Sequence, residues 1–254
     1  MERGIFPTRS QAEAAVREGR VRVGERVVEK PGTLVDPSLP LTVEEPAPFV
    51  SRGGVKLARA LDRFGVDPGG KVCLDVGAGT GGFTDCLLQR GAKRVYAVDV
   101  GYGQLAWKIR TDPRVVVRER VNARYLSSKE VPEKVDLATV DVSFISCLKI
   151  LPALKDLLAQ EGEILVLVKP QFEAGRGQVG KKGVVRDPRI HREVLHRVSA
   201  GAQALGFRVE GLLPSPLLGA EGNREFFLRL RKGSPLPEED LFGRIEKILS
   251  EEGG

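Results

Sequence analysis

The sequence has few of the residues that build metal sites and disulfide frameworks. Its 254 residues include three cysteines, none in a C-x-x-C pair, and two histidines, His191 and His196. An odd number of cysteines without such spacing argues against a disulfide framework and a zinc site, so we expect three buried thiols. The histidines lie five residues apart on a predicted helix and share a face poorly, and we interpret both as surface residues. We therefore expect no metal site.

Long apolar segments are missing as well. The longest unbroken aliphatic run, Ile164–Val168, is far shorter than the roughly 20 residues that cross a bilayer. The N-terminal residues contain no apolar stretch typical of a secretory signal. With 41% hydrophobic and 29% charged residues, the composition is that of an ordinary globular protein, which we expect in the cytoplasm without membrane association.

Positive charge is in modest excess and unevenly distributed. The formal net charge is +6, and arginines and lysines are clustered in segments 104–124 and 169–197. Clustered cations neutralise phosphates, so nucleic acid is a candidate partner, although such runs are more often solvated faces. The candidate RNA contacts outside the N-terminal segment are Arg52, Arg110, Arg176, Lys181 and Lys182.

A glycine-rich turn at Lys71–Asp85 is the most informative stretch of the sequence. The apolar run Val72–Val76 predicts a buried strand, and a helix is expected from Phe83. Glycines without Cβ atoms let the backbone approach a nucleotide-like ligand and permit positive φ angles. The candidate cofactor contacts of this turn are Asp75, Gly77, Gly79 and Gly81.

The spacing of the glycines fits two cofactors. Gly77-x-Gly79-x-x-Gly82 satisfies the dinucleotide fingerprint, and Gly77-x-Gly79-x-Gly81 satisfies the pattern usual in S-adenosylmethionine (SAM) enzymes. Asp99 ends the next predicted strand, where an acidic side chain suits the ribose hydroxyls of either cofactor. An NAD-linked oxidoreductase and a SAM-dependent enzyme both remain open at this point.

Strands and helices alternate along the rest of the chain. This pattern predicts a parallel, doubly wound sheet whose ligands lie beyond the carboxyl ends of the strands. Two later strands joined by a loop without a helix are expected to be antiparallel neighbours, and one reversed strand is characteristic of SAM-dependent methyltransferases. The predicted strands are 94–98, 115–118, 137–140, 164–168, 207–213 and 225–230. The predicted helices are 104–110, 148–158, 190–205 and 241–249.

Residues 1–46 differ in composition from the rest and predict a small α+β module. Ser10 as N-cap and Glu13 three residues later predict a capping box for a helix that ends at Gly19. Strands are expected at 21–23, 26–28 and 41–43.

The module resembles the S4-type RNA-binding domain through the run TRSQAEAAVREGRVRVGERVVEKPGTLV. It departs from that pattern in lacking the opening helix with its R-L-D sequence and in having Gly24 where the pattern has Asn. The resemblance implies RNA as a ligand, with phosphate contacts from Arg17, Arg20 and Arg22.

Residues 47–50 are a predicted linker, followed by an amphipathic helix over Val55–Phe64. Lys56 is expected in the first turn of this helix, where a cation is unfavourable beside the positive end of the helix dipole. From this feature alone, a functional lysine and a solvent-facing lysine are equally good interpretations.

Lysine at the end of a central strand is also costly unless an acid lies near it. The fold brings Asp141 to the strand end next to Lys169, and Lys56 and Glu225 are expected at the edges of the same cleft. These four residues make two charge pairs. Such a set suits methyl transfer to a ribose 2′-hydroxyl, because a neighbouring cation eases loss of the hydroxyl proton.

The chain as a whole resembles the TlyA-type family of haemolysin-labelled RNA 2′-O-methyltransferases, which are related to the FtsJ enzymes. The matching runs, which cover most of residues 50–230, are VSRGGVKL, LDVGAGTGGFTDCLLQRGA, YAVDVGYGQLAWKIRTDPRV, DVSFIS, LVKPQFEAGR, GVVRDP and GNREF. The resemblance implies a catalytic tetrad of Lys56, Asp141, Lys169 and Glu225. It implies SAM contacts by Gly77, Gly79 and Asp99, with Asn122 on the adenine side.

The sequence therefore predicts an α/β protein with a Rossmann-like methyltransferase sheet at 51–233, a C-terminal helix at 234–254 that packs on it, and the small N-terminal module. The expected activity is SAM-dependent methylation of a ribose 2′-hydroxyl of ribosomal RNA, with cytidine as the expected nucleotide and rRNA or a ribosomal subunit as partner.

Three alternatives explain less of the sequence. An NAD-linked oxidoreductase accounts for the glycines but not for the four-residue set. A base methyltransferase would carry an Asn/Asp-Pro-Pro-aromatic motif where DVSF stands, or a catalytic cysteine. The haemolysin label suggests a non-enzymatic RNA-binding or pore-forming protein. The sequence has no membrane segment or strong amphipathic candidate that would favour a pore.

Overall fold

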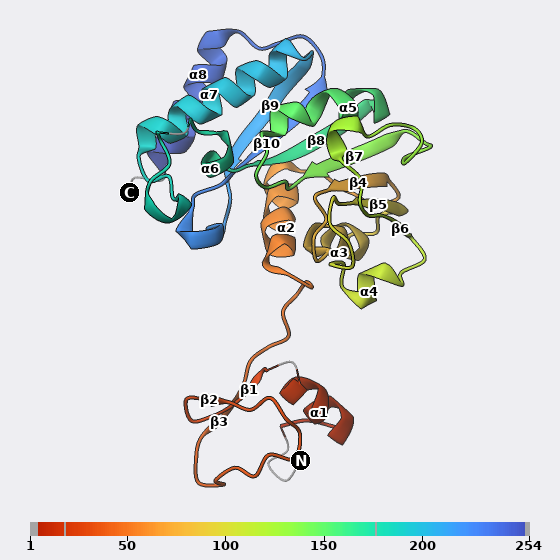
Figure 1. Ribbon diagram of the computed structural model, residues 1–254, viewed down its shortest axis with the longest axis vertical. Helices are drawn as coiled ribbons and strands as arrows, with labels where there is room; N and C mark the ends of the chain where they lie inside the picture. Colours follow the sequence, from red (N-terminus) through yellow and green to blue (C-terminus); the bar gives the residue numbers. More distant parts are fainter. Residues whose placement is uncertain (1–4, 18, 176, 252–254) are drawn as a thin grey trace. The chain divides into compact units, whose positions relative to one another are not determined.

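The computed structural model describes residues 5–17, 19–175 and 177–251 (Figure 1). The chain divides into two compact units, Met1–Pro48 and Phe49–Gly254. Each unit buries its own apolar side chains, so most contacts lie within a unit.

The first unit is one helix and a small antiparallel sheet. Helix α1 (Arg9–Arg17) precedes three strands in the order β2-β1-β3, with bounds β1 (Val21–Val23), β2 (Arg26–Val27) and β3 (Leu41–Val43). The predicted capping box is wrong. Gln11 donates its backbone N–H to the Thr8 hydroxyl at 3.3 Å, and Glu13 pairs with Arg9 instead of reaching back to Ser10. Thr8 therefore occupies the position at which Ser10 was expected.

The second unit is built on a seven-stranded sheet in the order β6-β5-β4-β7-β8-β10-β9. All pairs are parallel except those of β10, which runs antiparallel to both β8 and β9. This confirms the predicted sheet with one reversed strand. The strands are β4 (Val72–Val76), β5 (Arg94–Val98), β6 (Val115–Arg118), β7 (Val135–Val140), β8 (Leu158–Val168), β9 (Phe207–Pro214) and β10 (Phe226–Lys232).

Helices cover both faces of this sheet, as Figure 1 shows. On one face α2 (Arg52–Phe64), α3 (Gly82–Gln89) and the short α4 (Trp107–Arg110) pack around Leu61 and Leu87. On the other, α5 (Leu151–Leu157), α7 (Pro188–Ala204) and α8 (Glu238–Glu251) pack around Leu151 and Val198. Neighbouring strand residues alternate between the two cores, so most residues of the central strands are apolar, and Asp75 in β4 is a buried polar exception. The remaining short helices are η1 (Ala123–Tyr125), η2 (Cys147–Lys149), α6 (Pro170–Glu173), η3 (Lys181–Gly183) and η4 (Ala220–Gly222).

Several predicted boundaries shift for local reasons. Helix α2 begins after Ser51, so Lys56 lies in its second turn rather than in the first. The helix predicted over 104–110 is confined to Trp107–Arg110. The helix predicted over 148–158 is divided into η2 and α5, with Pro152 at the start of α5, where a missing N–H costs little. Strand β8 starts earlier than predicted because Leu158 pairs with Val135 beyond a register shift.

His191 was expected on the surface, and that interpretation is wrong. The side chain is buried on α7, with Nε2 3.1 Å from the carbonyl oxygen of Val185 and the ring edge against Phe226. His196, on the same helix, is half-buried and lies 3.6 Å from Glu238. All three cysteines are buried and unbridged, as predicted.

The aromatic contact between Phe227 and Phe83 ties β10 to α3, with ring centroids 6.1 Å apart. Phe227 is fully buried. We expect Phe227→Ala to lower the free energy of unfolding by about 3–5 kcal/mol, because it removes a large buried ring and leaves a cavity. Urea denaturation measures the effect. The matched control is Phe242→Ala, whose ring is 49% exposed. Equal losses in the two variants would contradict the assigned packing.

Candidate active site

The glycine-rich turn joins β4 to α3 at the carboxyl edge of the sheet. Gly77 has φ 84°, and a Cβ atom there would strike the carbonyl oxygen of Asp141. Gly79 has φ 51°, but a Cβ atom there would meet nothing closer than the Gly77 carbonyl oxygen at 4.0 Å. Gly77 is therefore required by the packing of the neighbouring strand end, and Gly79 faces open space.

A cavity of about 550 Å³, called the large cavity here, lies beyond the ends of β4, β5 and β7. Its polar groups include Asp99 and Asn122, and its apolar walls are Val98, Val121, Val142, Ile145 and Ile150. The Asp99 carboxylate accepts hydrogen bonds from the backbone N–H of Gly79 at 2.8 Å and of Gly101 at 2.6 Å. Asn122 caps η1 by accepting from Arg124 N–H at 3.1 Å.

These residues fit a nucleoside-type cofactor such as SAM. The bare backbone at Gly79 leaves room for the ligand, and a carboxylate one strand away suits ribose hydroxyls. The valine and isoleucine side chains offer a flat apolar slot for a purine base. Within the part of the chain that the structure describes, no group of three His, Cys, Asp or Glu side chains is arranged to hold a metal ion.

Asp75 and Gly81, both predicted cofactor contacts, line neither cavity of the site. Asp75 is fully buried beneath the turn and accepts hydrogen bonds from the hydroxyls of Thr84 at 2.7 Å and Thr139 at 3.1 Å. Burial raises the pKa of its carboxyl to about 7, although both hydroxyls oppose the shift. At Gly81, a Cβ atom would meet Leu105 at 2.9 Å. In this geometry both residues shape the turn from below.

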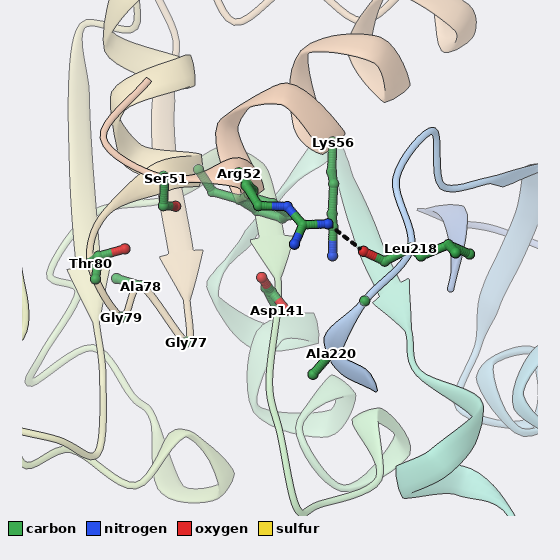
Figure 2. A pocket seen from close by; sticks show the side chains of 14 residues that line it. Ser51, Arg52, Lys56, Gly77, Ala78, Gly79, Thr80, Asp141, Leu218 and Ala220 are labelled. Atoms are coloured by element: carbon green, nitrogen blue, oxygen red, sulfur yellow. Dashed lines mark hydrogen bonds between the residues drawn. The ribbon is translucent and has the colours of Figure 1, made fainter. Parts of the chain in front are cut away.

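A second cavity of about 340 Å³, the small cavity, adjoins the first (Figure 2). Lys56 and Arg52 project into it from α2, toward the loop that carries Leu218 and Ala220. The Arg52 guanidinium donates to the carbonyl oxygen of Leu218 at 2.9 Å. Ser51 and Thr80 supply hydroxyl groups on the side of the glycine turn, as Figure 2 shows.

Two ion pairs bring together the four predicted catalytic residues. Lys56 Nζ lies 2.5 Å from Glu225 Oε2, and both side chains are almost completely buried. Lys169 Nζ lies 2.6 Å from Asp141 Oδ1 and donates to the Ser143 hydroxyl at 3.0 Å. Glu225 immediately precedes the reversed strand β10, which places its side chain at the same edge of the sheet as Asp141 and Lys169.

The two cavities share a wall made by Gly77, Gly79 and Asp141. Lys56 lines only the small cavity, and Lys169 lines only the large one. One cavity can thus hold a cofactor while the other admits a second reactant, with Asp141 accessible from both. This arrangement suits transfer of a group between two bound molecules.

The predicted RNA contacts differ in whether a carboxylate or carbonyl oxygen already engages their positive charge. Arg17 and Arg22 form ion pairs with Glu13 and Glu44, Arg20 donates to the Glu44 carbonyl oxygen, and Arg110 pairs with Glu119. Lys181 and Lys182 are exposed. Arg176 lies outside the described residues. We therefore expect the two lysines to be more available to phosphates than the paired arginines.

Phe144 is a feature that the sequence analysis missed. It lines the large cavity, its side chain is 91% exposed, and its φ of 63° is unusual for a bulky residue. Its ring lies 4.8 Å from that of Phe172, beside Lys169. Strained, exposed aromatic residues at a cavity mouth often serve ligands, and this ring can stack on a base. The only signal in the sequence is a phenylalanine between two serines in the short segment that follows Asp141.

A doubly wound sheet with one reversed strand, a glycine turn and a nucleoside-type cavity defines the class of SAM-dependent methyltransferases. The chain belongs to the FtsJ-like methyltransferase family, whose model matches residues 49–232. Residues 2–39 match the model of the S4 domain. For a methyltransferase of this family, SAM is the methyl donor.

Similar proteins extend over nearly the whole chain. The 16S/23S rRNA (cytidine-2′-O)-methyltransferase TlyA of Mycobacterium tuberculosis is 48% identical over 99% of this chain and 95% of its own. Hemolysin A of Brachyspira hyodysenteriae is 40% identical over 88% of this chain and 93% of its own. A Lactococcus lactis protein of known structure, provisionally described as a hemolysin, shares 46% sequence identity with this chain. The two structures match with a TM-score of 0.76 over 82% of this chain and 100% of the other.

We expect Gly79→Val to abolish SAM binding, because the added side chain would fill space shared by both cavities. Isothermal titration calorimetry measures the affinity. The matched control is Gly65→Val, since Gly65 has a similar φ of 63° and also has nothing within 4 Å, but ends α2 away from the cavities. Unchanged SAM affinity in folded Gly79→Val would place the cofactor elsewhere.

The buried Asp75 should make stability depend on pH. Its carboxyl has a pKa near 3.8 when unfolded and about 7 when folded, so the stabilisation present below pH 3.8 is lost progressively as the pH rises through 7. Asp75→Asn removes this dependence. We expect the difference in melting temperature, variant minus parent, to be larger at pH 8 than at pH 5. Each kcal/mol of change in the free energy of unfolding should shift the melting temperature by about 2–4 °C. The exposed Asp240→Asn serves as control. An equal difference at both pH values would refute the buried-charge explanation.

Proposed function

We propose that this protein transfers the methyl group of SAM to a ribose 2′-hydroxyl of ribosomal RNA, with cytidine as the nucleotide. The FtsJ-like family, the S4 domain and the name of the M. tuberculosis relative support this assignment. We further propose that it acts in the cytoplasm on rRNA or on a ribosomal subunit. Within the described residues, no helix has the length and apolar character needed to span a bilayer.

The observation that carries the proposal is the meeting of the two cavities at Asp141, with an ion-paired lysine on each side. SAM bound in the large cavity supplies an electrophilic methyl group. The Gly77–Gly79 backbone, Asp99, Asn122 and the apolar walls hold and orient it. The small cavity, with Lys56 and Arg52, admits the ribose and its phosphate.

Lys169 is the residue closest to the chemistry in this proposal. Its ammonium group is fixed by Asp141 and by the Ser143 hydroxyl, so it has a defined direction. A cation beside the 2′-oxygen makes the hydroxyl proton easier to lose. The proton passes to the Asp141 carboxylate, while Lys169 keeps its charge and its position. Fixed polar groups of this kind need no reorganisation during the reaction.

Lys56 and Glu225 have a different task. Both are buried, and a buried charge without its partner is strongly destabilising. Their pair gives the small cavity a positive group whose position is set by Glu225. We infer that Lys56 positions the incoming ribose, and that Glu225 holds the Lys56 side chain in place.

The alternative of an NAD-linked oxidoreductase is not favoured, since the family is one of methyltransferases. The hemolysin names of some relatives describe those proteins. No described feature of this chain favours pore formation over methyl transfer.

We expect Lys169→Ala to slow single-turnover methyl transfer to rRNA by roughly 10²–10⁴-fold, the range for a positioned proton-transfer group. SAM and RNA affinities should change little, because the lysine acts mainly on the transition state. Transfer of a labelled methyl group measures the rate, alongside SAM affinity and a melting curve.

Lys169→Met separates catalysis from charge neutralisation, because it keeps the shape of the side chain without the ammonium group. Lys155→Met is the control, since Lys155 bonds the Leu205 carbonyl oxygen away from the cavities. Near-normal turnover in a folded Lys169→Met variant would show that the lysine only balances Asp141 and would refute the mechanism.

A further inference from the structure

A third concave surface lies apart from the two cavities, over residues 178–190. It is a groove of about 550 Å³ lined by Lys181, Lys182 and Arg186, and is called the basic groove here. The three cationic side chains are exposed, and none of the described residues forms an ion pair with them. Arg17, Arg22 and Arg110, by contrast, form ion pairs with carboxylates. The basic groove therefore presents positive charge that no described carboxylate neutralises.

The acidic residue in the groove does not offset this charge. Asp187 caps α7, and its carboxylate is bonded by the Arg189 guanidinium at 2.8 Å and by Arg189 N–H at 2.9 Å. Arg189 holds the pKa of the Asp187 carboxyl below its usual range. The carboxylate therefore stays ionised and engaged by its neighbour, and the groove suits a polyanion.

Side chains from two other elements fix the backbone beneath the groove. Val185 N–H donates to Asn223 Oδ1 at 3.0 Å, and the Val185 carbonyl oxygen lies 3.1 Å from His191 Nε2. Both polar groups of this one peptide segment are thus bonded to buried side chains. Lys182 in the same turn has φ 63°, a backbone conformation that persists only where the surroundings impose it.

Asn223 also connects this turn to the small cavity. Its Nδ2 donates to the carbonyl oxygens of Gly183 and Ala220, each at 3.0 Å. Ala220 and Gly219 line the small cavity, and a Cβ atom at Gly219 would strike the carboxylate of Glu225. One buried amide therefore fixes the basic groove and the lip of the small cavity relative to each other.

We propose that the basic groove binds the phosphate backbone of the RNA substrate, and that Asn223 and His191 are positioning residues that hold it in register with the small cavity. That the bound polyanion is the RNA substrate rests on the proposed function. Phosphates held at Lys181, Lys182 and Arg186 would keep the strand at a fixed distance from the reacting ribose. The effect should appear in the KM for RNA.

The first experiment measures binding of rRNA fragments by fluorescence anisotropy over a range of salt concentrations. Lys181→Gln, Lys182→Gln and Arg186→Gln should each reduce the slope of log K against log salt by about one unit. Lys93→Gln is the matched control, because Lys93 is exposed at the opposite edge of the sheet, before β5. Slopes equal to that of the control would overturn the groove as an RNA site.

The second experiment tests the positioning residues by steady-state methylation of rRNA. His191→Leu should raise the KM for RNA by roughly three- to tenfold, with kcat and SAM affinity unchanged, because the cations lose their fixed register. His191→Gln restores a donor to the Val185 carbonyl oxygen and should recover most of the loss. His196→Leu, on the same helix, is the control.

Asn223→Asp keeps an acceptor for Val185 N–H but turns a carboxylate toward two carbonyl oxygens. It should raise the KM for RNA and also lower kcat, because it disturbs the lip beside Glu225. Changes in melting temperature alone, with KM values equal to that of His196→Leu, would overturn the positioning role. If the parent protein binds rRNA through the groove but does not methylate it, the proposed function fails and the groove stands.

Discussion

The site depends on the close approach between Gly77 and the carbonyl oxygen of Asp141. Adjacent parallel strands end side by side, but a side chain on the first would push the second away. Because position 77 carries none, the Asp141 backbone closes against the turn, and Asp141 becomes part of both cavities. The pairing of Asp141 with Lys169 then follows from the register of β7 and β8, which brings their carboxyl ends to the same edge.

The second constraint is the burial of Lys56 and Glu225. Neither charge is tolerable alone in its position, and the pair forms only because Gly219 leaves space for the carboxylate. The two residues are 169 positions apart in the chain. Helix α2 and the reversed strand therefore have to be placed accurately against each other, which the contact of Phe83 with Phe227 supports from within the core.

Most of the sheet could be predicted from the sequence because its strands are short apolar runs between glycines, prolines and acids. Strands β5 and β6 begin and end at the predicted residues. Short-range signals failed where tertiary contacts compete with them. Thr8 caps the helix in place of Ser10, and His191 is buried against Val185 and Phe226 although Arg189, Arg192 and Glu193 lie close to it in the sequence. The family pattern led to Lys56 and Glu225, but their pairing distance depends on packing that no local pattern encodes. The role of Asn223 could not be predicted, because it depends on which backbone groups its side-chain amide bonds. Two of these, in Val185 and Gly183, lie 38 and 40 residues earlier in the chain.

The position of β10 between β8 and β9 has a consequence for the order of events during synthesis. Residues 207–214 leave the ribosome before residues 226–232, yet the later strand occupies the inner place. Until it arrives, β8 presents an unpaired edge, and β9 has no strand on which to form. Glu225 arrives with β10, so a nascent chain that already contains the glycine turn, Asp141 and Lys169 still has an unpaired Lys56. The ion pair at Lys56 can thus form only after residue 225 has been made.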